Sequence, residues 1–394
     1  MTMTIGLAGK PNAGKSTFFK AATLADVEIA NYPFTTINAN RGVTYVRTDC
    51  PCTEKGKPCG KCNDGVRYVP IEIIDVAGLV PDAHKGRGLG NAFLDELRQA
   101  QAIIHVIDAS GGTDIEGNPG DIGSHDPLGD IDFLNREITM WMAGILNRNW
   151  LRLARKIKAE GLKPEQAIAE QLMGAGVCEA DVHEALCQYK DDNYEKWEEN
   201  QLCELCEIIR ILSKPLMIAA NKMDVAPPEN VKKLRELDLI VVPTSAAAEL
   251  ALRNAAKHEI IDYIPGNEDF NIISEDLDDK QKKGLESLKA FMQSHKPAGC
   301  GVQECINKAV FELLDLIVVY PVEDESHWTD KNENMLPDAY LMKRGSTAHD
   351  LAYRVHTDIG KAFLYAVDGR TKMRLGEKHE LQDGDVIKIV STAR

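Results

Sequence analysis

GLAGKPNAGKST, residues 6–17, decides how the first part of this chain folds. Gly9 is followed, after four intervening residues, by Gly14-Lys15-Ser16, which is the spacing G-x-x-x-x-G-K-[ST] of a phosphate-binding loop. TIGLAG (4–9) before the loop is typical of a short buried strand, and STFFKAATLA (16–25) after it is typical of a helix. Backbone N–H groups in such a loop, together with the helix N-terminus, bind phosphate. The stretch therefore predicts a strand–loop–helix unit with a nucleotide phosphate site.

This loop supplies most of the residues that we predict to contact a nucleotide. Lys15 occupies the position that reaches the β- and γ-phosphates, and Ser16 the position whose hydroxyl ligates Mg²⁺. The predicted contacts in the loop are Gly9, Pro11, Asn12, Ala13, Gly14, Lys15, Ser16 and Thr17.

A second motif, Asp75-Val76-Ala77-Gly78, ends the apolar run IEIID. At the carboxyl end of a strand, the Asp75 carboxylate can help to hold Mg²⁺, and the Gly78 amide can donate to the γ-phosphate. Asp-x-x-Gly alone is also a plain strand-to-turn signal. After a phosphate loop it predicts the metal and γ-phosphate side of the same site.

Two further motifs predict the base. Asn221-Lys222-Met223-Asp224 follows the apolar run PLMIAA, and the Asp224 carboxylate can accept two hydrogen bonds from guanine. Adenine presents no such pair of donors, so a site of this kind rejects it. Ser245-Ala246-Ala247, after LIVVPT, predicts a backbone amide near the guanine carbonyl oxygen. The predicted base-side contacts are Asn221, Lys222, Asp224, Ser245, Ala246 and Ala247.

Composition limits the function classes. The formal charge of −15 argues against a protein that coats nucleic acid, and no apolar run approaches the ~18 residues that a membrane span needs. A phosphate loop that begins at Gly9 leaves no room for a secretory signal, so we expect a cytoplasmic protein without a membrane partner. Its ten cysteines are then expected as reduced thiols or metal ligands.

The order of strand and helix patterns predicts an α/β fold of several domains. Apolar runs at 71–78, 102–109, 215–222 and 239–246 alternate with helical patterns, which indicates a parallel sheet covered by helices. We predict a P-loop nucleotide hydrolase domain of the Ras-like kind, split by a helical insertion, and a separate small C-terminal domain. The predicted boundaries are 1–111 with 215–266 for the nucleotide domain, 112–214 for the insertion, 267–316 for a helical segment that completes or links that domain, and 317–394 for the C-terminal domain.

The ordered motifs resemble the translation-factor-type GTPases, and two stretches resemble the YchF-type branch of the Obg family. NYPFTT (31–36) is similar to the family's switch I, which implies Thr36 as a Mg²⁺ ligand, with Thr35 as the alternative. DVAGLVPDAHKGRGLGNAFLDELR (75–98) is similar to its Gly-rich switch II, although Pro81-Asp82 departs from that pattern. Many YchF-type relatives have lost Asn-Lys-x-Asp and prefer ATP. This chain keeps the motif, so we expect GTP and GDP as its nucleotides.

The mechanism of hydrolysis cannot use the usual glutamine. Leu79 follows Asp-x-x-Gly where many GTPases have a water-orienting Gln, and the family resemblance implies His84 in its place. The alternative for His84 is a solvent-exposed loop histidine. We predict His84, Lys15 and Gly78 as the catalytic set. Asn12 stands where K⁺-activated GTPases carry an asparagine, so it is either a K⁺ ligand or a turn residue.

The stretch CPCTEKGKPCGKC (50–62) carries four cysteines in two close pairs, Cys50/Cys52 and Cys59/Cys62. Four thiols with this spacing can surround one tetrahedral Zn²⁺ in a structural site. The alternative is an exposed hairpin with reduced thiols. Cys203-x-x-Cys206 lies in a helical pattern and is expected to pack on a helix face.

The C-terminal segment, from LPDAYLMKRG onward, resembles a TGS domain, a small β-grasp unit. We expect a helix start at Ser346-Thr347 and a hairpin with an Asp-Gly turn in LYAVDGRTK. Residues 340–394 contain ten Lys and Arg against seven Asp and Glu, a local charge of +3, with Arg370, Lys372 and Arg374 close together. This contrast and the resemblance predict a ribosome or ribosomal RNA as partner, and the alternative is a solvated surface of mixed charge.

Three functions fit these observations. The first is a slow GTPase whose nucleotide state controls binding to the ribosome or another RNA-containing partner. The second is an ATP and GTP hydrolase in stress or protein homeostasis, against which Asn221 and Asp224 argue. The third is a non-catalytic scaffold with a structural nucleotide.

Overall fold

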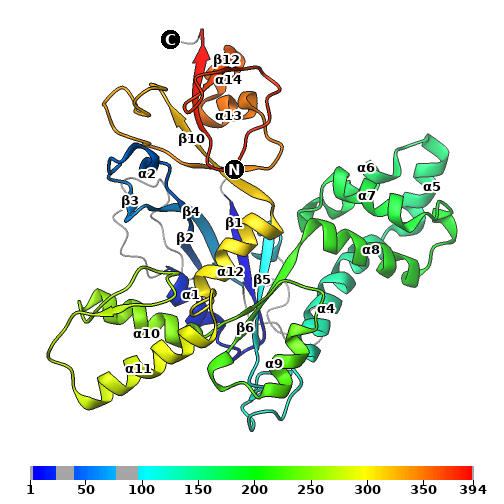
Figure 1. The fold of residues 1–394 in the computed structure, drawn as a ribbon. Helices are drawn as coiled ribbons and strands as arrows, with labels where there is room; N and C mark the ends of the chain where they lie inside the picture. The colour runs from blue at the N-terminus through cyan, green and yellow to red at the C-terminus, as the bar shows by residue number, and fades with distance from the viewer. Residues whose placement is uncertain (1–2, 24–39, 77–95, 393–394) are drawn as a thin grey trace. The chain divides into compact units, whose positions relative to one another are not determined.

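A computed structural model describes residues 3–23, 40–76 and 96–392 (Figure 1). The chain divides into two compact units. Among the described residues, the first unit takes the chain up to Thr44 together with Ile71–Cys305, and the second takes Tyr45–Pro70 together with the chain from Ile306 onward. The residues Thr35, Thr36, Gly78, Leu79, Pro81, Asp82 and His84 lie outside the described ranges.

A mainly parallel sheet forms the centre of the first unit. Its order is β2-β4-β1-β5-β6-β7, with β3 paired to β4. The bounds are β1 (Thr4–Ala8), β2 (Arg41–Asp49), β3 (Cys62–Asn63), β4 (Val66–Asp75), β5 (Ala102–Asp108), β6 (Leu216–Asn221) and β7 (Val241–Pro243). The parallel sheet predicted from the apolar runs is confirmed for β4, β1, β5, β6 and β7. β3 differs because it pairs with β4 in an antiparallel hairpin. The second unit takes β3 together with the end of β2 and the beginning of β4.

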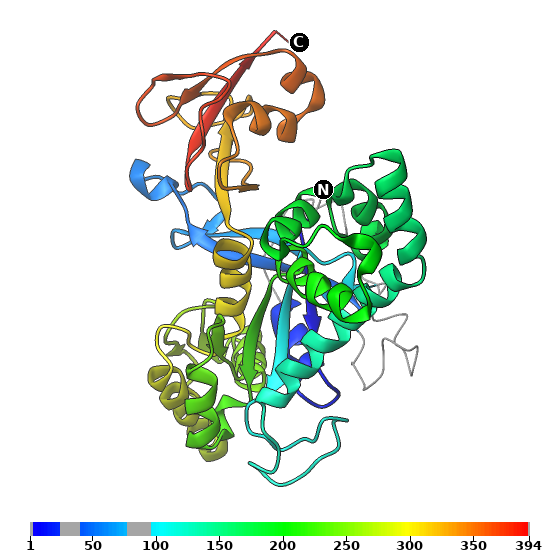
Figure 2. The same cartoon turned by 90° about the vertical axis from the view of Figure 1, so that its right-hand side faces the viewer.

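Helices cover this sheet (Figure 2). A group of further helices comes after β5 and before β6 in the chain. The group consists of α4 (Leu128–Asn147), α5 (Trp150–Glu160), α6 (Pro164–Leu172), α7 (Glu179–Tyr189) and α8 (Glu199–Ser213). Ile131, Leu134 and Ile138 of α4 are buried in the same apolar cluster as Ile103 and Ile107 of β5. α4 therefore packs against β5, the strand that precedes it in the chain. Within the described ranges, no helix has both the length and the apolar character required to cross a bilayer.

The remaining elements of the first unit come after the predicted nucleotide motifs in the chain. They are α1 (Lys15–Thr23), α9 (Pro228–Arg235), α10 (Ala246–Lys257), β8 (Ile261–Asp262), β9 (Asn271–Ile272) and α11 (Asp279–Ser294), and α12 (Val302–Lys308) then crosses the division between the units. α1 follows the phosphate loop and packs with α10. The parallel strands β1, β4, β5 and β6 all end toward the same edge of the sheet, where ligands of such folds bind.

The second unit is built on a sheet of order β11-β10-β14-β12-β13. Its bounds are β10 (Leu316–Val322), β11 (Tyr340–Lys343), β12 (Phe363–Asp368), β13 (Arg374–Leu375) and β14 (Val386–Ser391), with helices α13 (Ala348–Val355) and α14 (Thr357–Lys361). The predicted helix start is confirmed, because the Thr347 side chain accepts from the Asp350 N–H in a capping box. The predicted hairpin is confirmed by the antiparallel pairing of β12 and β13.

The early segment around α2 (Cys52–Lys55) and β3 also belongs to the second unit. Cys50, Cys52 and Val69 are buried in one apolar cluster with side chains of β10 and β14. The core of the second unit is therefore assembled from two stretches of chain, one ending at Pro70 and the other beginning at Ile306.

Candidate nucleotide site

Close backbone contacts explain the two glycines of the phosphate loop. A Cβ atom on Gly9 would lie 2.4 Å from the Val106 carbonyl oxygen of β5, a distance that no side chain tolerates. Gly14 has a φ of +95°, and a Cβ there would lie 2.1 Å from the side-chain nitrogen of Asn221. Because each position excludes a side chain, the loop keeps its backbone close to its neighbouring strands.

The structure brings together three of the predicted phosphate and metal residues. Lys15 forms an ion pair with the Asp75 carboxylate. The Ser16 hydroxyl lies 3.4 Å from the other oxygen of the same carboxylate. A hydroxyl and a carboxylate in this position are hard oxygen donors of the kind that Mg²⁺ prefers. The residues present therefore fit a magnesium site, and the third predicted ligand, Thr36, lies outside the described residues.

Asn221 braces the phosphate loop against the last motif of the site. Its side-chain amide donates to the Ala13 carbonyl at 2.8 Å, and its side-chain oxygen accepts from the Ala246 N–H at 2.9 Å. The side chain is buried, so both hydrogen bonds are shielded from water. One asparagine thus fixes the distance between the phosphate side and the base side.

Lys222 is held by a carboxylate that the sequence analysis missed. Its ammonium group donates at 2.8 Å to Asp108, which is completely buried at the end of β5 and also accepts from Ser110 and Thr113. Burial favours a raised pKa for Asp108, but hydrogen bonds from Lys222, Ser110 and Thr113 outweigh it and hold the pKa below its usual value. Asp108 therefore stays ionised.

The base-side motifs leave Asp224 and Ala247 exposed. Asp224 lies in the short helical turn Met223–Val225. Ser245 instead uses its hydroxyl to cap α10, where it accepts from the Ala248 N–H at 3.3 Å, and the Ala246 N–H is taken by Asn221. Ala247 stands in the first turn of α10. Of the three residues predicted in this last motif, Ala247 is therefore the one that a base can approach.

The Gly/Asp-rich segment after β5 packs against the phosphate loop. Asn12 donates from its side-chain nitrogen to the Gly117 carbonyl at 3.0 Å. A Cβ on Gly117 would lie 2.5 Å from the Pro11 carbonyl oxygen, so the two backbones are in close contact. The segment between β5 and α4 is therefore part of the wall of the candidate site.

A buried ion pair fastens this segment, and the sequence analysis did not predict it. Lys10 is 3 % exposed, lies 2.9 Å from the Asp130 carboxylate and donates to the Thr113 carbonyl at 2.8 Å. His125 lies 2.8 Å from the same carboxylate. The available signal was the basic residue inside the phosphate loop, together with an unusually long Gly/Asp-rich connection.

The four cysteines predicted as zinc ligands lie together in the second unit. All four sulfur atoms are within 4.8 Å of one another. Cys206, of the second Cys-x-x-Cys pair, is instead buried in the apolar cluster of the helices between β5 and β6, as predicted for a packed helix face.

Three family models match the chain. A model of 50S ribosome-binding GTPases matches residues 4–128, a model of the Obg-like GTPase YGR210-like, G4 motif-containing domain matches residues 219–324, and a TGS domain model matches residues 333–391. The first covers the phosphate loop and Asp75, the second covers Asn221 and Asp224, and the third covers most of the C-terminal sheet.

Individual relatives match over nearly the whole chain. A GTP-binding protein of Methanocaldococcus jannaschii is 50% identical, with 99% of each chain covered. The ribosome-binding ATPase YchF of Bacillus subtilis is 29% identical, with 98% of each chain covered. The crystal structure of a GTP-binding protein from Pyrococcus horikoshii has a TM-score of 0.79 at 45% identity and covers 99% of this chain and 100% of that one. The chain therefore belongs to the YchF-type, TGS-containing branch of the Obg family of P-loop GTPases.

Proposed function

We propose that this protein binds GTP in preference to ATP, hydrolyses it slowly and uses its nucleotide state to control binding to the ribosome. The observation that carries the proposal is the exposed Asp224 beside the braced Asn221, on the same sheet edge as the phosphate loop. The domain boundaries predicted from the sequence and a cytoplasmic location are part of this proposal.

The base preference follows from the hydrogen-bonding groups on the base side. The Asp224 carboxylate accepts from the ring N–H and the exocyclic amine of guanine, and the Ala247 N–H donates to the guanine carbonyl oxygen. Adenine reverses this pattern, so an adenine base would leave the polar groups unpaired. Relatives named ribosome-binding ATPase do not change this preference, because it follows from the Asp224 carboxylate of this chain.

On the phosphate side, Ser16, Asp75 and Thr36 would hold Mg²⁺, and the ion would supply positive charge to the phosphates. Lys15 exchanges its ion pair with Asp75 for the phosphate oxygens. Gly78 donates its amide to the γ-phosphate, and His84 orients the attacking water, because Leu79 has no polar group for that task. A site with one histidine in place of the usual glutamine accounts for slow turnover.

The orientation of Asn12 supports the K⁺ proposal. Its side-chain nitrogen is held by the Gly117 carbonyl at 3.0 Å, so its oxygen is the atom that remains for a cation. Oxygen donors suit a hard cation such as K⁺. Asn12 is exposed, which gives an ion access from the phosphate side.

The ribosomal partner is supported by the relatives' name and by the exposed Arg374, whose guanidinium lies 4.3 Å from the Tyr365 ring centre. Such a pair presents a cation for RNA phosphates and an aromatic face for bases. Arg370 and Lys372 contribute less, because Arg370 binds Glu54 and Lys372 donates to the Gly369 carbonyl.

Three experiments test the proposal: nucleotide binding, co-sedimentation with ribosomes and GTP turnover. Equilibrium binding of labelled GTP and ATP should give a GTP affinity at least ~100-fold higher, and equal ATP affinity would favour the broader hydrolase function. Co-sedimentation with ribosomal subunits should differ between a GTP analogue and GDP, and Arg374→Gln should weaken it. No turnover with Mg²⁺ and K⁺, even beside ribosomes, would favour the scaffold function. Unchanged turnover in His84→Ala would remove His84 from the mechanism.

A further inference from the structure

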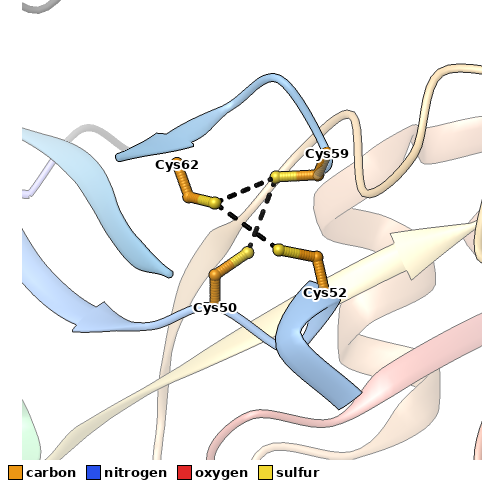
Figure 3. A group of neighbouring side chains, drawn as sticks. All are labelled: Cys50, Cys52, Cys59 and Cys62. Carbon is orange, nitrogen blue, oxygen red and sulfur yellow. Dashed lines mark hydrogen bonds between the residues drawn. The ribbon is translucent and has the colours of Figure 1, made fainter. Parts of the chain in front are cut away.

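The four cysteines of residues 50–62 form a compact cluster in the second unit (Figure 3). The sulfur–sulfur distances are 3.7 Å for Cys50–Cys59, 3.5 Å for Cys52–Cys62 and 3.4 Å for Cys59–Cys62. Disulfide sulfurs are about 2.05 Å apart, so these are free thiols in contact. Four thiolates that each lie about 2.3 Å from one tetrahedral Zn²⁺ are about 3.8 Å apart. The cluster therefore has nearly the dimensions of a one-metal site.

Secondary structure holds the two pairs of cysteines in place. Cys52 is the first residue of α2, and Cys62 is the first residue of β3, where it pairs with Arg67 of β4. The Cys50 N–H donates to the Gly65 carbonyl at 2.7 Å, which closes the segment at its base. The cysteines thus approach from both ends of a closed loop, as the ligands of a zinc knuckle must.

One cationic side chain and one backbone N–H contact the Cys59 sulfur and partly offset the charge of the cluster. Zn²⁺ with four thiolates carries a net charge of −2. The Arg67 guanidinium, on a residue that is 5 % exposed, lies 4.0 Å from the Cys59 sulfur, and the Lys61 N–H donates to that sulfur at 3.4 Å. Donors of this kind stabilise metal-bound thiolates.

We propose that Cys50, Cys52, Cys59 and Cys62 bind one structural Zn²⁺, and that this zinc centre holds residues 50–62 against the C-terminal sheet. Four protein ligands fill a tetrahedral site and leave no position for a substrate, which is why the role is structural. An iron–sulfur cluster would place an inorganic core between the thiolates, and sulfur atoms all within 4.8 Å leave no room for one.

The cluster is built into the core of the second unit. Cys50 and Cys52 are 1 % and 3 % exposed and pack in one apolar cluster with Tyr320 and Trp328. Apart from its cysteines, CPCTEKGKPCGKC contains no large apolar side chain. A segment whose only large buried side chains are cysteines gains little free energy from burial, and a bound metal would add to it.

Polar contacts next to the cysteines complete the attachment. The Glu54 carboxylate accepts two hydrogen bonds from Arg370, at 2.8 and 2.7 Å. Lys55 donates to the Ser326 carbonyl at 3.0 Å, and its ammonium nitrogen lies 4.5 Å from the Trp328 ring centre. Both residues belong to α2, which begins at Cys52, so loss of the metal would release these contacts together.

Metal content is the first test. The full chain, purified without added metal, should contain about one zinc per chain, and Cys52→Ser/Cys62→Ser should lose it. Cys178→Ser/Cys187→Ser removes two exposed thiols outside the cluster and is the matched control, which should keep its zinc. Absence of metal from the wild type, or iron in place of zinc, would overturn the zinc assignment.

Hydrogen exchange on the wild-type chain tests the attachment without relying on a variant that folds. Removing zinc with a chelator should speed exchange in residues 50–66 and in β10, and adding Zn²⁺ should restore protection. GTP affinity should remain within about twofold, because the cysteines belong to the second unit whereas the described nucleotide-site residues belong to the first. This result separates failure of the zinc proposal from failure of the GTPase proposal. Unchanged exchange in β10 after zinc removal would show that the metal does not hold the segment.

Discussion

Lys222 donates a hydrogen bond at 2.8 Å to the completely buried carboxylate of Asp108. Lys222 belongs to the motif after β6, whereas Asp108 is the last residue of β5, so the ion pair joins the carboxyl ends of neighbouring strands. Because Ser110 and Thr113 donate to the same carboxylate, one buried charge positions both the base-side motif and the segment after β5.

We expect Asp108→Asn to lower the free energy of unfolding by about 2–4 kcal/mol, because removing one partner of a buried ion pair leaves the other uncompensated. Lys222 is one-third exposed, which keeps the loss toward the lower value. Denaturant unfolding measures it. Asp121→Asn, at an exposed position of the following segment, is the control and should change stability by less than about 0.5 kcal/mol. Equal stability of Asp108→Asn and wild type would contradict the assigned role.

Lys10 and Asp130 should be energetically coupled. Lys10→Met and Asp130→Asn should each cost about 3 kcal/mol, because each leaves a buried partner unpaired. The double variant should cost less than the sum, with a coupling energy of at least about 1 kcal/mol. Unfolding curves of the four proteins give this cycle, and strict additivity would exclude the coupling.

Stability should fall in acid partly through His105. Burial first, and the Lys10 charge second, lower the pKa of His105 to about 3. Between this value and the ordinary value of 6.5, the unfolded chain binds more protons than the folded protein. The contribution of His105 to the free energy of unfolding is therefore fully present above pH 6.5. It is lost as the pH falls below that value, by about 1.4 kcal/mol per pH unit. His105→Gln should reduce this slope between about pH 6.5 and pH 4.5, and an unchanged slope would contradict the assignment.

Asp224→Asn should exchange guanine for xanthine. The asparagine side chain can donate to the 2-oxo group of xanthine but no longer accepts two hydrogen bonds from guanine, so GTP affinity should fall at least ~100-fold while xanthosine triphosphate gains. Competition with a fluorescent nucleotide measures both affinities. Asp238→Asn, at another exposed position of the same unit, should behave as wild type. Binding of xanthosine triphosphate shows that the site is folded, and unchanged GTP affinity in Asp224→Asn would contradict the predicted contact.

Asn12→Ala should abolish stimulation of GTP hydrolysis by K⁺. The substitution removes the side-chain oxygen and also the hydrogen bond to Gly117, so the rate of the same variant in Na⁺ is the reference for its stimulation by K⁺. Initial rates in the two salts at equal ionic strength measure the effect. Equal stimulation in wild type and variant would assign Asn12 to the turn alone, through its contact with Gly117.

Local spacing accounts for what the sequence determined by itself. Gly9 and Gly14-Lys15-Ser16 specify a phosphate loop because the glycines that its backbone needs lie only a few residues apart. The alternation of apolar runs and helical patterns predicted the parallel sheet, and Ser346-Thr347 predicted the start of α13. Each of these features depends on residues close together in sequence.

Only the tertiary structure decided which distant residues meet. Asn221 contacts Ala13 across 208 positions of sequence, and Arg370 contacts Glu54 across 316. No spacing rule predicts such pairs, because they depend on strand order and register, which follow from packing of the whole sheet. The same reason explains why Asp108 was missed at the end of its strand, and why a cysteine segment near the start of the chain belongs to the core of the C-terminal unit.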